Sequence, residues 1–120
     1  MAKILIVDDS PSQIENLTRM LVPNGHQIIT AGNGADGIAK AAAEQPDLVL
    51  MDVVMPEMNG FQATRKLTRE PATQHIPVII VSTKDQETDR IWGMRQGARG
   101  YLVKPPTEQA LLEMVGELLK

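Results

Sequence analysis

The chain has 120 residues, a net charge of −3 and no cysteine. This length suits one compact domain, and we expect residues 1–120 to form a single domain. The charge provides no basic footprint for nucleic acid, and the lack of cysteine excludes disulfides and thiolate metal sites.

The apolar residues predict a parallel sheet covered by helices. Phe, Trp and Tyr occur once each, so a core must be built from aliphatic side chains, which buried parallel strands favour. The first apolar run, Ile4–Val7, is too short for a signal peptide or a membrane span. We therefore expect a cytoplasmic protein without membrane insertion.

The first half of the chain predicts two helices between three strands. Ser10 and Pro11 are typical of a helix start, and Pro23 ends that helix. An Ala-rich helix follows later, with Ile38 and Ala42 predicted on one face. In chain order, the elements are strand Ile4–Val7, a helix from Pro11 to before Pro23, strand Gln27–Ala31, helix Gly34–Gln45 and strand Leu48–Met51.

The second half continues this alternation. Pro56 and Gly60 bracket a turn, and Gly97 ends a later helix. The predicted elements are a helix through Phe61, Thr64 and Leu67, strand Pro77–Val81, helix Gln86–Gln96, strand Tyr101–Val103, and a helix from Thr107 with Leu111, Met114, Val115 and Leu118 facing inward.

Five strands alternating with five helices predict an α/β fold, a doubly wound parallel sheet with helices on both faces. The pattern alone leaves the strand order open. In the flavodoxin-like order 2-1-3-4-5, ligands would bind at the carboxyl ends of the first and third strands, where the order reverses.

Three aspartates stand at those strand ends. Asp8 and Asp9 follow the first strand, and Asp52 follows the third. Each alone could merely favour a helix start or begin a loop. Together, without nearby His or Cys, they predict an oxygen-ligand site that suits Mg²⁺.

Further motifs complete a recognisable set. Ser82 follows the fourth strand, and Lys104 follows the fifth. The whole chain resembles the receiver domain of bacterial two-component response regulators, through Asp8-Asp9, Asp52, Val54-Met55-Pro56 with Gly60, Ser82, Gly97-Ala98, Tyr101 and Lys104-Pro105. This resemblance implies the strand order 2-1-3-4-5.

The resemblance also implies the metal and phosphorylation chemistry. It makes Asp52 the acceptor of a phosphoryl group. A protein that phosphorylates itself in this way acts as a switch, and we do not expect a dedicated enzyme. Asp9, Asp52 and the backbone carbonyl of Val54 would bind Mg²⁺ directly, and Asp8 would act largely through water.

The remaining signature residues are expected to sense the phosphoryl group. Lys104 would supply a positive charge and Ser82 a hydroxyl, although a solvated lysine and a backbone-bonded serine are the plain alternatives. By resemblance, Tyr101 would turn inward and alter the surface of the fourth helix, fifth strand and fifth helix. Trp92 either anchors a partner on that surface or packs against its own domain.

Four sequence stretches point to a pathway. Among stand-alone chemotaxis-type regulators, the chain most resembles the small regulator of type IV pilus twitching motility, through Gly60–Arg65, Thr83–Arg90, Trp92-Gly93 and Arg95–Arg99. The implied partners are a chemotaxis-like histidine kinase as phosphodonor and a downstream protein target. Because the chain stops at Lys120, after the last predicted helix, we expect no output domain.

Two other functions are rejected because the residues they need are missing. A flavodoxin would need a Ser/Thr/Gly-rich loop after the first strand and more aromatic residues. A haloacid-dehalogenase-type phosphatase would need an acid where Val54 stands. Two alternatives stay open: an adaptor that works without phosphorylation, its acidic site intact but unused, and a phosphate sink for a shared kinase.

Overall fold

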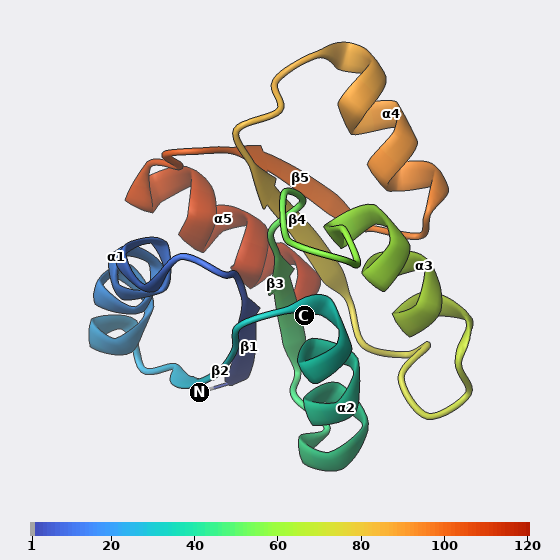
Figure 1. Cartoon of the computed structure of the whole chain (residues 1–120). Coiled ribbons are helices and arrows are strands. Elements are labelled where there is room, and N and C mark those ends of the chain that lie inside the picture. Colours follow the sequence, from blue (N-terminus) through green and yellow to red (C-terminus); the bar gives the residue numbers. More distant parts are fainter. Residues whose placement is uncertain (1) are drawn as a thin grey trace.

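The protein folds as a five-stranded parallel sheet between two layers of helices (Figure 1). The structure, a computed structural model, describes residues 2–120. The strand order is β2-β1-β3-β4-β5, which confirms the flavodoxin-like fold class. The elements are β1 Lys3–Val7, α1 Pro11–Leu21, the 3₁₀ helix η1 Val22–Asn24, β2 Gln27–Ala31, α2 Gly34–Glu44, β3 Leu48–Met51, α3 Gly60–Arg69, β4 Val78–Ser82, α4 Glu87–Arg95, β5 Gly100–Val103 and α5 Glu108–Leu118.

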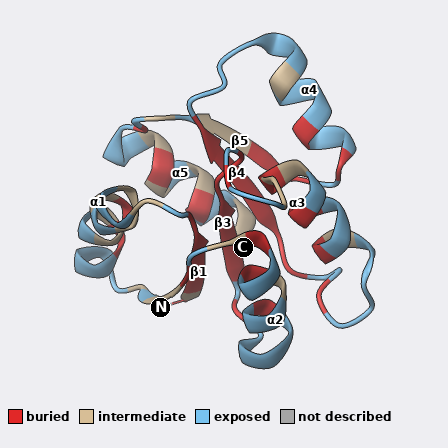
Figure 2. Cartoon of the chain, in the orientation of Figure 1, coloured by how far each residue is buried: buried red, intermediate tan, exposed pale blue. Residues whose placement is uncertain are grey.

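Every residue of the central strands β3 and β4 is buried, because helices cover both faces of the sheet (Figure 2). Successive side chains point to opposite faces. Ile4 and Ile6 pack with α1 and α5, whereas Leu5 and Val7 pack with α2 and α3. A third, smaller cluster contains Ile80 of β4, whose side chain lies next to α4 at Gly93. No helix within residues 2–120 is long and apolar enough to cross a membrane.

The predicted boundaries hold to within about two residues, with one error in orientation. Ser82 is the last residue of β4 rather than the residue after it. In α2, Ile38 packs against the core, but Ala42 is exposed and Ala41 is buried in its place, so the predicted face is wrong at Ala42. Alanines occupy three successive positions there, and the apolar pattern therefore could not orient the helix.

The start of α3 lies unusually close to the end of β3. The Asn59 side chain accepts from the Gln62 amide at 2.9 Å, and the Gln62 side chain accepts from the Asn59 amide at 3.0 Å. The Gly60 amide donates to the Val53 carbonyl at 2.8 Å. A Cβ at Gly60 would overlap the Asp52 carbonyl and lie 2.8 Å from the Val53 Cα. Only glycine fits this approach without moving the backbone.

We predict that Gly60→Ala destabilises the fold by about 2 kcal/mol or more, since backbone atoms must move to admit the methyl group. Gly116→Ala is the matched control, because a Cβ at Gly116, within α5, meets nothing within 4 Å. The control should stabilise by about 0.5–1 kcal/mol through helix propensity. Urea unfolding of both variants checks the pair, and equal stabilities would contradict the close approach.

Candidate functional site

Three carboxylates meet at the carboxyl edge of the sheet. Because β1 and β3 are neighbours, with Val7 paired to Met51, the residues that follow them lie side by side. Carboxylate oxygens of Asp8, Asp9 and Asp52 all lie within 4.8 Å of one another. Asp8 and Asp52 are buried, and Asp9 is exposed. The structure thus brings together the three predicted acidic residues.

Lys104 joins this cluster from the far side of β4. Its Nζ donates to Asp8 Oδ2 at 2.8 Å and to Asp52 Oδ1 at 3.0 Å. The lysine side chain is only 7% exposed, so it is no solvated loop lysine. One ammonium therefore bridges two buried carboxylates that are 44 residues apart in the chain.

Burial and neighbouring charges shift the pKa values of Asp52 and Lys104. Burial has the largest influence on Asp52 and raises the pKa of its carboxyl above the ordinary 3.8; the hydrogen bond from Lys104 opposes this, and the charge of Asp8 adds to it. Burial alone would lower the pKa of Lys104, but the hydrogen bonds to Asp8 and Asp52 outweigh it and raise that pKa above 10.5. Lys104 is therefore cationic, and ionising the Asp52 carboxyl costs more free energy in the folded protein than in water.

The donor set suits a hard divalent cation. It offers carboxylate oxygens without sulfur or imidazole, and the exposed Asp9 leaves access for water, as Mg²⁺ requires. Asp8 uses both oxygens within the protein, since Oδ1 accepts from the Ser10 amide at 2.9 Å and Oδ2 from Lys104. Asp8 is consequently the least free of the three to hold an ion directly. Val54 lies beyond Asp52 in the loop, with 60% of its surface exposed.

Ser82 and Tyr101 are connected through the backbone of one residue, Lys84. The buried Ser82 Oγ accepts from the Lys84 amide at 3.1 Å, and the Tyr101 hydroxyl donates to the Lys84 carbonyl at 2.7 Å. The Tyr101 ring packs in the cluster that contains Ile80 and Phe61. Sequence reasoning missed Lys84 as the link, because backbone groups carry no residue-specific signal.

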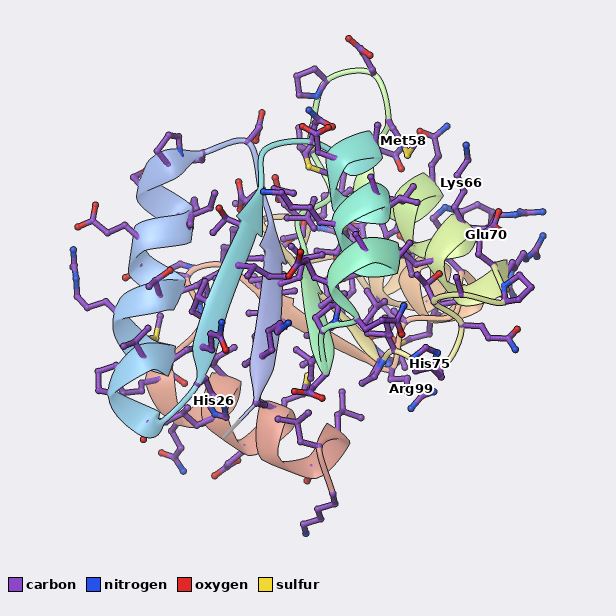
Figure 3. All side chains as sticks on the ribbon, turned by 90° about the horizontal axis from the view of Figure 1, so that it is seen from below. His26, Met58, Lys66, Glu70, His75 and Arg99 are labelled. Carbon is purple, nitrogen blue, oxygen red and sulfur yellow. The ribbon has the colours of Figure 1, made fainter. Side chains whose placement is uncertain are left out.

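An exposed apolar surface lies beyond Tyr101. Trp92 is 49% exposed, so about half of its surface packs against its own domain and the other half faces solvent. It belongs to a set of exposed large apolar side chains on α4 and β5, namely Ile91, Trp92, Met94 and Val103. His26 and His75 lie in loops outside the acidic cluster and line a separate hollow at the amino-terminal edge of the sheet (Figure 3).

Comparison with known proteins now identifies the family. Residues 4–116 match the family model of the response regulator receiver domain. This chain belongs to the response regulator receiver domain family. Receiver domains are switches rather than dedicated enzymes, take phosphoryl groups from histidine kinases, and bind Mg²⁺ at an acidic cluster of this kind.

Individual relatives cover this receiver domain almost completely. It is 60% identical to Protein PilH of Pseudomonas aeruginosa over 99% of this chain and 98% of that protein. It is 39% identical to Response regulator PleD of Caulobacter vibrioides, but spans only 26% of that longer protein. The solved chemotaxis protein CheY4 of Vibrio cholerae superposes with a TM-score of 0.91 at 32% identity, with 99% of each chain covered.

The raised Asp52 pKa predicts that Asp52→Asn stabilises this receiver domain, by on the order of 1 kcal/mol, at neutral pH without divalent ions. Below pH 3.8 the carboxyl holds its proton in both the folded and the unfolded state, so the advantage should vanish there. As pH rises through the native pKa, only the wild type loses stability. Thermal melts across pH check this, with exposed Asp85→Asn as control; an equal gain in the control would contradict the burial cost.

Tyr101 supplies a second pH prediction. Burial raises the pKa of its phenol above 10.0, the nearby Ser82 hydroxyl opposes this, and the charges of Asp89 and Asp85 reinforce the rise. Because the chain has one tyrosine, its absorbance change near 295 nm reports this group alone. We expect a midpoint above 10 in the folded protein and a return to the ordinary value in urea. A folded-state midpoint at or below 10 would contradict this environment.

Proposed function

We propose that residues 1–120 form a single stand-alone receiver domain in the cytoplasm that accepts a phosphoryl group on Asp52 from a chemotaxis-like histidine kinase. Phosphorylation switches the surface of α4, β5 and α5 toward a protein target in the control of type IV pilus twitching motility. The observation that carries this proposal is the buried Asp8–Lys104–Asp52 bridge at the sheet edge.

Each site residue has a role that its chemistry supports. The Asp52 carboxylate attacks the phosphorus atom of the donor phosphohistidine, the P–N bond breaks, the imidazole of the donor histidine leaves, and an acyl phosphate forms on Asp52. Lys104 already contacts Asp52 at 3.0 Å and balances the added negative charge. Mg²⁺, held by Asp9, Asp52 and the Val54 carbonyl with Asp8 acting through water, would neutralise charge on the carboxylate and phosphoryl oxygens.

The backbone of Lys84 links Ser82 of the site to Tyr101, beneath α4, through two hydrogen bonds. Ser82 Oγ accepts from the Lys84 amide. If Ser82 moves to donate its proton to a phosphoryl oxygen, this contact changes and the loop reorganises. The loop holds the Tyr101 hydroxyl, and the Tyr101 ring lies beneath α4 at Gly93, where a Cβ would come within 3.2 Å of the ring. A phosphoryl group that favours one arrangement of this chain of contacts would therefore shift α4.

The exposed apolar side chains on this surface favour a protein target. Trp92 and Val103 expose large apolar area next to the Tyr101 contact, and aromatic side chains with such exposure are frequent binding anchors. The twitching-motility assignment is supported by the motif resemblance in Gly60–Arg65 and Thr83–Arg90, and by the 60% identity to PilH over nearly the whole length of both chains.

Intact mass after incubation with acetyl phosphate tests the proposed acceptor. We expect the wild type to gain one phosphoryl group only when Mg²⁺ is present, and Asp52→Asn to gain none. Asp85→Asn, which removes an exposed carboxyl of the same kind, should gain as much as the wild type. No gain by the wild type, even with a purified kinase as donor, would overturn the proposal in favour of an adaptor that works without phosphorylation.

A further inference from the structure

A groove of about 990 Å³ runs between the start of α2 and the outer side of α3. It lies on a different part of the surface from Trp92 and Val103, and begins beside Asp9. Met58, half-buried, and Pro56 give it an apolar part. Figure 3 shows, in succession, Met58 in the loop before α3, Lys66 on α3 and Glu70 just after its end.

One wall of this groove is strongly positive. Arg65, Lys66 and Arg69 are exposed and line the groove, and α3 contains no acidic residue over Gly60–Arg69. Within residues 2–120, none of these three side chains forms an ion pair with a carboxylate of the protein, in contrast to Arg19, which pairs with Glu15, and Arg90, which pairs with Glu87. The wall thus presents three unneutralised charges on a protein whose net charge is −3.

The rest of the groove carries acidic side chains: Asp9, Asp36 and Glu57 line it away from α3, and Glu70 lines it directly after the end of α3. Asp36 is already engaged there, because its carboxylate accepts from the Asn33 side chain at 3.1 Å. The groove is therefore polarised, with its free positive charge concentrated along α3. A ligand that fits must place negative charge against α3 and apolar surface against Met58.

We propose that this groove docks an acidic amphipathic helix of a partner protein. The three cations span little more than one helical turn, so acidic side chains three or four residues apart on a facing helix can each meet one. An apolar side chain on the same face can pack on Met58, as in other helix-in-groove complexes. The volume, at the top of the range for small-molecule pockets, suits a protein segment better than a single small ion.

This docking site does not depend on phosphorylation of Asp52, so the test uses the full unphosphorylated chain. The probe is a fluorescein-labelled helical peptide of about 18 residues, with leucine on one face and glutamate on its flanks. Fluorescence anisotropy at low salt should show saturable binding that weakens at least about tenfold at physiological salt, because the contacts are ionic and exposed.

The decisive variants reverse charge in two places. Arg65→Glu/Lys66→Glu/Arg69→Glu should weaken binding at least about tenfold. Arg19→Glu/Arg99→Glu/Lys120→Glu changes the net charge equally away from the groove and should leave binding within about twofold. Circular dichroism confirms that both triple variants fold. Met58→Ala, which removes the apolar contact alone, should weaken binding several-fold.

Three results would overturn this proposal. Absence of saturable binding would remove the site, and an equal loss in both triple variants would reduce it to general charge attraction. Binding of anionic lipid vesicles or single-stranded DNA through the same three cations, at lower concentration than the peptide, would make the occupant a membrane or a nucleic acid instead of an acidic helix.

Discussion

Two buried carboxylates, Asp8 and Asp52, share the single ammonium of Lys104, and the rest of the site depends on this imbalance of charge. One cation cannot neutralise two buried anions together with the exposed Asp9 beside them, so the edge of the sheet retains negative charge. That excess favours a divalent cation. Lys104 favours the carboxylate form of Asp52 in surroundings that otherwise disfavour its charge, which is how proteins commonly prepare a reactive group.

The sheet makes this arrangement possible. Parallel strands with neighbouring carboxyl ends bring residues 8, 52 and 104 together, although they are far apart in the chain. The same edge places Ser82 at the end of β4, where the backbone of Lys84 connects it to Tyr101 and the packing beneath α4. At Gly60 the backbone just after β3 comes so close that only glycine fits, and at Gly93 the side chains of Ile80 and Tyr101 pack close to the backbone of α4. Chemistry at Asp52 and the outer surface of α4 are therefore a few contacts apart.

Much of this was predictable from sequence, for a physical reason. Buried parallel strands appear as continuous apolar runs, and their ends mark the site, so Asp8, Asp9 and Asp52 could be grouped before the fold was known. Lys104 was expected to act on the phosphoryl group, but its bridge between Asp8 and Asp52 required the structure, since it depends on side-chain reach across β4. The Lys84 link, the overlap at Gly60 and the α2–α3 groove depend on backbone positions in space. The buried face of α2 was misassigned because its successive alanines carry no direction.

The central claim is that a change at Asp52 reaches the surface of α4 through Ser82, Lys84 and Tyr101. Amide chemical shifts of ¹⁵N-labelled protein, recorded before and after addition of Mg²⁺ and beryllofluoride as a phosphoryl mimic, test it most directly. We predict large shifts at Lys84 and Tyr101 and along α4, besides those around Asp52. Shifts confined to the loops that carry Asp8, Asp9 and Asp52, with α4 and Tyr101 unchanged, would contradict the account.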